Sequence, residues 1–230
     1  MTYVMSDIHG MYDKYIRMLD LIGFSDDDDL YIIGDVVDRG DKSAEVLLDM
    51  MKRPNVYPII GNHELMALNV LDVMFNGANG NSPVPLEAML GDWLVNGGAF
   101  TLDSISKLSD DKRLDVLDYL SEFTYYETVD INSKTYIMVH SGFENFRPER
   151  RLPDYSVHEL VWHRPDPEFR YFDDECICRR DRAICTGFQS HLAGRREPLR
   201  RNVEPLARCF FQPSPLTAHG HCPAKCKVTD

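Results

Sequence analysis

The chain has 230 residues, which is enough for one sizeable α/β domain and short for two. Hydrophobic residues make up 43% of it and charged residues 27%, and its apolar runs are shorter than the roughly 18 residues that a membrane span needs, which argues against a membrane protein. A formal net charge of −12 argues against DNA or another nucleic acid as the main partner, because neutralising phosphates requires a Lys and Arg surface.

Charge and cysteine content divide the chain near residue 175. Residues 1–174 contain 15 Lys and Arg against 32 Asp and Glu, whereas residues 175–230 contain 10 against 5 and hold all six cysteines. We therefore expect one domain over residues 1–174, followed by an atypical basic, cysteine-rich tail over residues 175–230. The first residues lack the basic and apolar regions of a signal peptide, so we expect a cytoplasmic location.

The first third of the chain alternates between strand and helix patterns. Short apolar runs predict strands, and apolar residues at helical spacing follow each run after a polar loop. The predicted strands are 2–5, 30–33 and 56–60, and the predicted helices are 11–22, 44–51 and 65–75. Three such units indicate a layered α/β fold.

The next segments complete the expected architecture. Residues 77–85 are rich in Gly, Asn and Pro and predict a loop. Residues 86–123 have a helical pattern with a break near Asn96-Gly97-Gly98, and we expect them to form a cap. Alternating patterns at 125–131 and 134–139 predict a hairpin that begins a second sheet. The expected fold is therefore two sheets flanked by helices (αββα), with C-terminal strands that are disrupted if the tail is not native.

Each predicted strand of this region ends in a cluster of polar residues. The clusters are Asp7-Ile8-His9-Gly10, Gly34-Asp35-Val36-Val37-Asp38-Arg39-Gly40, Gly61-Asn62-His63-Glu64 and His140-Ser141-Gly142. Ligand sites of α/β sheets lie beyond the carboxyl ends of the strands, so the four clusters should converge. Asp, His and Asn supply the oxygen and imidazole ligands that suit Mn²⁺, Fe or Zn²⁺. A single Asp-x-His is more often a surface turn or a helix cap, but four clusters at strand ends favour a metal site.

These motifs resemble those of the PPP-type phosphoprotein phosphatases, a branch of the calcineurin-like metallophosphoesterases. Gly-Asp-x-x-Asp-Arg-Gly followed by Gly-Asn-His-Glu is shared by bacterial serine/threonine protein phosphatases and by symmetrical dinucleoside-tetraphosphate hydrolases. The resemblance covers roughly residues 1–174. It implies a metal-dependent phosphoric ester hydrolase with two divalent metal ions, Mn²⁺ before Fe or Zn²⁺.

The resemblance also assigns metal ligands. Asp7 and His9 would bind the first metal ion, and Asp35 would bridge both ions. Asn62 and His140 would bind the second ion, and Asn62 would also contact the substrate phosphate. Paired metal ions activate water for in-line attack on phosphorus, so no covalent phosphoenzyme is expected.

Further roles follow from the same motifs. His63, oriented by Asp38, would protonate the leaving oxygen as the general acid. Arg39 would contact the phosphoryl oxygens through its planar guanidinium, and Arg164, in a Trp-x-Arg segment, is a second phosphate-binding candidate. Glu64 is expected to act through helix capping and backbone hydrogen bonds.

The tail departs from the family pattern. Family members carry a last metal-binding His in a Gly-His-Thr-Pro turn, which this sequence lacks, and Gly220-His221-Cys222-Pro223 is the nearest match. His221 is therefore the candidate for the last metal ligand. Three alternatives stay open: a reading-frame shift near Cys178 replaced the native C-terminus, the tail is disordered, or a zinc cluster forms in it. Its ligands would be His219, His221, Cys222 and Cys226.

Three functions are compatible with the sequence. The first is hydrolysis of phosphate monoesters, with a phosphorylated protein or a small phosphate ester as the substrate, as in a serine/threonine protein phosphatase. The second is a symmetrical bis(5'-nucleosyl)-tetraphosphatase, which needs a base pocket and more cationic contacts. The third is an inactive remnant that binds one metal ion. The sequence gives no prediction of the oligomeric state.

Overall fold

The computed structural model describes residues 1–76, 84–131, 134–164, 171, 176–178, 208–210 and 225–228. The elements in chain order are β1 (Thr2–Met5), α1 (Tyr12–Ile22), β2 (Asp29–Ile33), α2 (Ser43–Met50), β3 (Val56–Ile59), α3 (Asn62–Asn76), α4 (Leu86–Val95), α5 (Gly98–Ser106), α6 (Asp110–Ser121), β4 (Tyr126–Ile131), β5 (Lys134–Val139), η1 (Leu152–Asp154), α7 (Val157–Val161), β6 (Cys176–Cys178), β7 (Arg208–Phe210) and β8 (Lys225–Val228). Among the described residues, no helix is long and apolar enough to cross a membrane.

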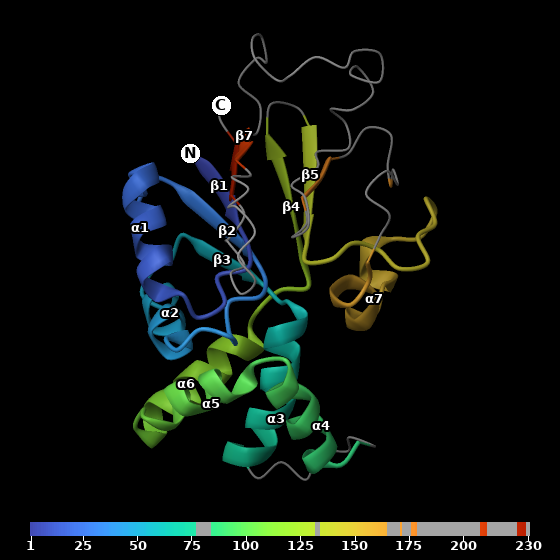
Figure 1. The fold of residues 1–230 in the computed structure, drawn as a ribbon. Coiled ribbons are helices and arrows are strands. Elements are labelled where there is room, and N and C mark those ends of the chain that lie inside the picture. The colour runs from blue at the N-terminus through green and yellow to red at the C-terminus, as the bar shows by residue number, and fades with distance from the viewer. Residues whose placement is uncertain are drawn as a thin grey trace, which may run out of the picture.

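The strands form two sheets, as the sequence predicts. One sheet has the order β3-β2-β1-β8-β7, in which β1, β2 and β3 are parallel and β8 is antiparallel to β1. The other has the order β4-β5-β6, in which β4 and β5 are antiparallel and β6 is parallel to β5. Figure 1 shows α1 and α2 beside the first sheet and the β4-β5 ribbon on its other side. The α/β fold with two sheets is therefore confirmed. The short strands β6, β7 and β8 were not predicted.

The two faces of β1 enter different parts of the core. Tyr3 and Met5 belong to the larger hydrophobic cluster, which also contains the buried residues of α1 and α2. Val4, which points the other way, packs in a second cluster with Tyr136 and Met138 of β5. This alternation follows from the two-residue repeat of a strand. The second cluster therefore joins the two sheets, and each side chain that it buries contributes about 1.5–3 kcal/mol.

Helix α1 shows how the local sequence sets an element's length. Tyr15 and Leu19, four residues apart on one face, are buried against the core. The helix ends where Gly23 adopts a left-handed conformation (φ 62°) and donates its N–H to the carbonyl of Asp20 at 3.1 Å. The helix thus covers the sheet and returns the chain to β2, whose carboxyl end lies at the same edge as that of β1.

Three helices, α4, α5 and α6, form the predicted cap. The break between α4 and α5 falls at Asn96-Gly97, as predicted, and Gly97 is left-handed (φ 99°). A second break precedes α6 and was not predicted. Ser109 is the N-cap residue of α6 and two aspartates occupy its first turn, where negative charge favours the positive end of the helix dipole. The sequence Ser109-Asp110-Asp111 could have predicted this helix start.

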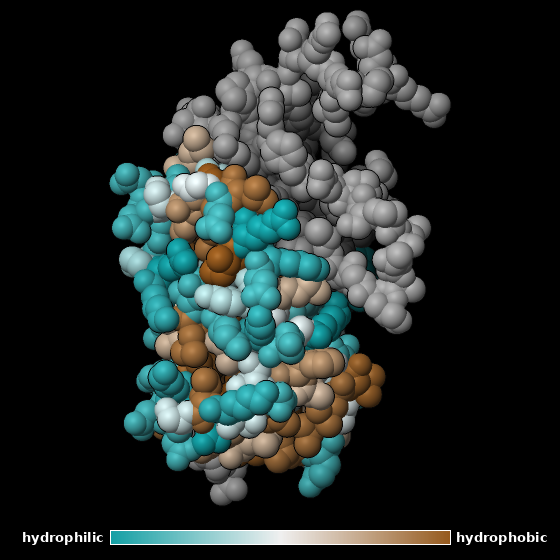
Figure 2. Space-filling view, turned by 60° about the vertical axis from the view of Figure 1, so that its left-hand side comes forward, coloured by the Kyte–Doolittle hydropathy of each residue, from teal (hydrophilic) through white to brown (hydrophobic). Residues whose placement is uncertain are grey.

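The cap has an apolar outer surface. Figure 2 shows hydrophobic residues gathered over the lower part of the molecule, where Figure 1 places α3 to α6. The exposed large hydrophobic residues of these helices and of the segments beside them are Met74, Val84, Leu94, Val95, Phe100 and Leu114. The side of the cap that faces the rest of the protein carries polar contacts, which are described below.

Candidate metal centre

The polar clusters at the strand ends come together in the folded chain. His9 Nε2 lies 3.7 Å from Asp35 Oδ2 and 3.9 Å from Asp7 Oδ1. The loops that follow β1 and β2 are joined by backbone hydrogen bonds, with the N–H of His9 donated to the carbonyl of Asp35 at 2.9 Å. The three side chains that the sequence assigns to the first metal ion therefore lie around one point.

The second group of predicted ligands lies on the other side of Asp35. His140 Nε2 is 3.3 Å from Asp35 Oδ1 and 3.0 Å from Asn62 Oδ1. Asp35 thus presents one carboxylate oxygen to His9 and the other to His140. Both histidine side chains are 0% exposed and Asp35 is 1% exposed. This is the arrangement that a carboxylate bridging two cations requires.

The tautomers of both histidines suit metal binding. His9 Nδ1 lies 2.9 Å from the carbonyl oxygen of Val37, and His140 Nδ1 lies 2.8 Å from that of Ile33. A carbonyl only accepts, so Nδ1 carries the hydrogen in both rings. His9 Nε2 keeps its lone pair toward the cluster, whereas His140 Nε2 faces the acceptor oxygens of Asn62 and Asp35, where a proton or a cation is needed. Burial lowers the pKa of His9 to about 4, although Asp35 opposes the shift. The ring is therefore neutral near pH 7, and the donor set fits a divalent cation.

The backbone at the site is strained. Among the described residues, six other than glycine have a positive φ, and five of them belong to the polar clusters: Asp7, His9, Asp35, Asp38 and Arg39. Such conformations cost of order 1–3 kcal/mol each and persist only where the surrounding structure enforces them. Their concentration in two loops indicates that these loops are shaped for ligand binding.

Glu64 fixes the loop after β2 by accepting hydrogen bonds from its backbone. It is completely buried, and its carboxylate accepts backbone N–H groups from Gly61 and Asp35 at 2.8 Å, from Val36 at 2.7 Å and from Val37 at 3.0 Å. Burial, and then the charge of Asp35, raises the pKa of Glu64 to about 7, while the backbone hydrogen bonds oppose this shift. Glu64 therefore caps the start of α3 and fixes Asp35, as the sequence predicts.

Gly34 supplies the space in which His140 sits. A Cβ atom on Gly34 would lie 2.5 Å from His140 Nδ1, and Gly34 has φ +80°. We expect Gly34→Ala to destabilise the fold by about 1–2 kcal/mol and to lower the metal content, because the imidazole must move. Gly23→Ala is the matched control, since φ is +62° and nothing lies within 4 Å. Metal analysis and thermal unfolding of both variants test this. Equal metal content in both would contradict it.

His63 and Asp38 form a buried pair next to the cluster. His63 Nδ1 lies 2.7 Å from Asp38 Oδ2, and both side chains are at most 1% exposed. Burial lowers the pKa of His63, but the hydrogen bond to Asp38 and the charges of Asp35 and Asp38 outweigh it, so the pKa lies above its usual value. The pair can therefore hold a proton near neutral pH.

Arg39 spans the space between two imidazoles. Its Nη1 lies 2.8 Å from His9 Nε2 and its Nη2 lies 2.9 Å from His63 Nε2. A guanidinium only donates, so both contacts use neutral rings, whereas the carboxylates near His63 favour its charged form. A proton on His63 Nε2, or a cation on His9 Nε2, would displace the guanidinium. Arg39 is thus placed to turn toward an anionic ligand at the same point.

The ligand atoms of His9, Asp35 and His63 lie within 4.8 Å of one another, and all three residues are buried. The sequence assigns His63 to catalysis instead. His63 commits Nδ1 to Asp38, so its Nε2 alone faces the cluster. Its role as general acid stays a prediction.

Other predicted residues lie outside this cluster. Arg164 is exposed and follows α7, so its phosphate contact stays a prediction. The side chain of His158 is 72% exposed and lies 3.7 Å from Glu144, in keeping with an ordinary surface histidine. His221 and the proposed zinc ligands His219 and Cys222 lie outside the described residues, and nothing is described of the side chain of Cys226.

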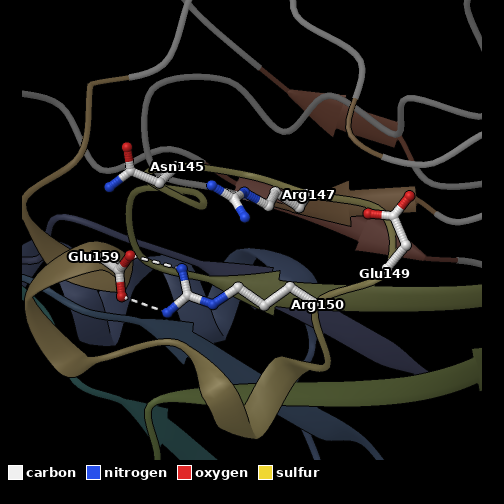
Figure 3. A pocket seen from close by; sticks show the side chains of 5 residues that line it. All are labelled: Asn145, Arg147, Glu149, Arg150 and Glu159. Atoms are coloured by element: carbon white, nitrogen blue, oxygen red, sulfur yellow. Dashed lines mark hydrogen bonds and ion pairs between the residues drawn. The ribbon is translucent and has the colours of Figure 1, made fainter.

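A pocket of about 560 Å³ lies elsewhere, next to α7. The lining residues are Asn145, Arg147, Glu149, Arg150 and Glu159, as Figure 3 shows. Arg150 makes a two-pronged ion pair with Glu159, with distances of 2.7 and 2.8 Å. None of the predicted site residues that the structure describes lines this pocket. We assign the chemistry to the cluster around Asp35, where the ionisable groups converge.

Comparison with known proteins shows the family of this chain. The calcineurin-like phosphoesterase family matches residues 2–189. The chain belongs to the calcineurin-like phosphoesterases. The serine/threonine-protein phosphatase 2 of Salmonella typhimurium is 31% identical over 142 residues, which are 61% of this chain and 58% of that protein. The symmetrical bis(5'-nucleosyl)-tetraphosphatase of Nitrosomonas europaea is 28% identical over 160 residues, 69% and 47% of the two chains.

Solved structures with related folds are also found. A serine/threonine phosphatase from Saccharomyces cerevisiae matches with a TM-score of 0.41 and 19% identity, covering 74% of this chain and 46% of that one. A metallophosphoesterase from Sphaerobacter thermophilus matches with a TM-score of 0.42 and 17% identity, covering 71% and 50%. The chain spans about half the length of the curated relatives it matches.

Proposed function

We propose that this protein is a metal-dependent hydrolase of phosphate monoesters that acts as a serine/threonine protein phosphatase. The observation that carries the proposal is the position of Asp35 between two sets of ligands, with His9 on one side and His140 on the other. The buried pair of His63 and Asp38 beside it supports a proton-transfer role. Similarity to a protein named as a serine/threonine phosphatase favours this substrate class.

Five residues would hold the metal ions, namely Asp7, His9, Asp35, Asn62 and His140. When bound, two divalent cations lower the pKa of water and neutralise charge on the attacking and leaving oxygens. We propose Mn²⁺ because the mixed oxygen and imidazole donors suit it. His221 would complete the second set, and without it we expect the second ion to be held less firmly than the first.

The remaining residues of the site act on the substrate. Arg39 would leave the two imidazoles and bind the phosphoryl oxygens through its planar fork, which matches a phosphate. His63 Nε2 would donate its proton to the leaving oxygen, while Nδ1 stays hydrogen-bonded to Asp38. Asp38 thereby keeps the ring oriented and favours its charged form. Proton donation matters most when the leaving group is a poor one, such as the serine or threonine alkoxide.

Symmetrical hydrolysis of dinucleoside tetraphosphates is the second candidate, because the tetraphosphatase of Nitrosomonas europaea is similar over 69% of this chain. The two functions are separated by assaying a phosphoserine peptide and diadenosine tetraphosphate in parallel, with Mn²⁺ present. We expect a higher kcat/KM for the peptide. A higher value for the dinucleotide would reverse the order of the candidates. Turnover of neither substrate would support the inactive remnant.

A further inference from the structure

Two cap helices reach into the proton-transfer pair. Trp93 of α4 is fully buried, and its Nε1 donates to both carboxylate oxygens of Asp38 at 3.0 Å. Thr101 of α5 donates its hydroxyl to Asp38 Oδ1 at 2.8 Å and accepts the backbone N–H of Asp38 at 2.7 Å. Asp38 therefore receives three side-chain donors: the imidazole of His63, an indole and a hydroxyl.

The turn between these helices contacts Arg39. The carbonyl of Gly97 accepts the backbone N–H of Arg39 at 3.1 Å. A Cβ on Gly97 would lie 2.9 Å from Arg39 Cγ, and one on Gly98 would lie 2.5 Å from the ring of Trp93. Gly97 is therefore required by the close approach of the cap to Arg39, and Gly98 by the packing of the Trp93 ring against it. The segment Trp93 to Thr101 thus contacts both Asp38 and Arg39.

These contacts have a physical consequence for His63. Asp38 is 0% exposed, and a buried carboxylate with one donor could rotate about its terminal torsion or be drawn to other donors. The indole N–H lies equally far from both oxygens and holds the carboxylate plane, while Thr101 occupies Oδ1. Oδ2 is thereby directed at His63 Nδ1. The orientation of the imidazole is therefore set from the cap.

We propose that Trp93 and Thr101 are positioning residues for proton transfer, which hold the Asp38 carboxylate and through it the imidazole of His63. The cap would then orient the proton-transfer pair of His63 and Asp38. This inference rests on the proposed function, because it concerns the step in which His63 acts as general acid. A role in packing alone is the competing explanation for a buried tryptophan, and it predicts equal effects on every substrate.

The test compares Trp93→Phe, which keeps an aromatic ring and removes the N–H, with Thr101→Val, which keeps the shape and removes the hydroxyl. Ser104→Ala is the matched control. Ser104 is also a buried α5 hydroxyl, but it contacts Ala44 and Glu45 of α2. Hydrolysis of an alkyl phosphate and an aryl phosphate is measured for each variant, alone and combined with His63→Asn. Thermal unfolding shows which variants are folded.

We expect Trp93→Phe and Thr101→Val to lower kcat for the alkyl phosphate by about 10-fold or more, with the aryl phosphate changed much less and KM retained. Added to His63→Asn, neither change should lower the alkyl rate further. Ser104→Ala should leave the ratio of the two rates unchanged. If Trp93→Phe does not fold, Thr101→Val carries the test, because it replaces the side chain with one of the same shape.

A second readout does not depend on turnover. In the metal-free protein, the proton between His63 Nδ1 and Asp38 should give a downfield proton resonance that disappears in His63→Asn. We expect Trp93→Phe and Thr101→Val to shift or broaden it, and Ser104→Ala to leave it in place. If Trp93→Phe and Thr101→Val lowered the rates on both esters equally and left the resonance unchanged, the inference would be overturned and the general-acid assignment would stand. Equal loss on both esters in His63→Asn itself would overturn the inference together with the general-acid assignment.

Discussion

Asp35→Asn should abolish turnover and remove bound metal. The two oxygens of Asp35 face His9 on one side and His140 on the other. The carboxylate thus supplies negative charge to both cation positions, whereas an amide supplies none and offers one weakly charged oxygen. Metal content by elemental analysis and hydrolysis of an aryl phosphate with excess Mn²⁺ measure the two effects. Retention of two metal ions per chain with a near-normal rate would disprove the bridging role.

The fold of Asp35→Asn should survive. The charge of Asp35 raises the pKa of the buried Glu64, so removing that charge relieves a repulsion in the metal-free protein. We therefore expect a thermal midpoint for the metal-free variant that is no lower than that of the unmodified protein. Asp103→Asn is the matched control, because the side chain of Asp103 is 66% exposed and pairs with Lys107. Asp103→Asn should keep the metal content, the hydrolysis rate and the thermal midpoint of the unmodified protein.

His63→Asn should lower the hydrolysis of alkyl phosphates far more than that of aryl phosphates. General acid catalysis typically contributes about 10² to 10⁴, and an aryl leaving group needs little of it because its oxygen is already a weak base. Metal content should change little, since His63 directs Nδ1 to Asp38. Steady-state rates with a series of esters of rising leaving-group pKa measure the effect. A uniform loss across the series would assign another role to His63.

A control separates this effect from the loss of any histidine. The side chain of His158 is 72% exposed and lies on α7, so His158→Asn should leave both ester rates unchanged. The pH dependence offers a further comparison. Because the Asp38 hydrogen bond and the carboxylate charges outweigh burial and raise the pKa of His63, the alkyl-phosphate rate should persist above the usual histidine pKa and fall as pH rises further. The fall should be absent in His63→Asn.

Much of the architecture could be predicted from the sequence, because the first sheet consists of apolar runs that end in motif loops. The loops after β1 and β2 carry Asp7 and Asp35, and parallel strands bring such ends to one edge. His140 follows β5 of the second sheet. The β6, β7 and β8 strands could not be predicted, since three or four residues in a basic, cysteine-rich segment give no readable alternation. Their pairing partners are set by the fold alone.

The contacts between the cap and the site could not be predicted from the sequence either. Trp93 donates to Asp38 across 55 positions, and Thr101 does so across 63. Helical periodicity places Trp93 on a buried face, but it does not say which acceptor its N–H finds. The contact between Arg39 and the two imidazoles likewise depends on three left-handed residues in the loop after β2, namely Asp35, Asp38 and Arg39. The sequence signal for this turn was the predicted break at Asn96-Gly97-Gly98.

If paired cations at Asp35 perform phosphoester hydrolysis, the rate must depend on both ions. The most direct measurement strips the full chain of metal, adds Mn²⁺ in steps, and follows both the number of ions bound and the hydrolysis of an aryl phosphate. We predict no turnover in the stripped protein, firm binding of a first ion without full activity, and a rise in rate as a second, more weakly held ion binds. Full turnover by the stripped protein, or a rate indifferent to the second ion, would contradict the two-metal site.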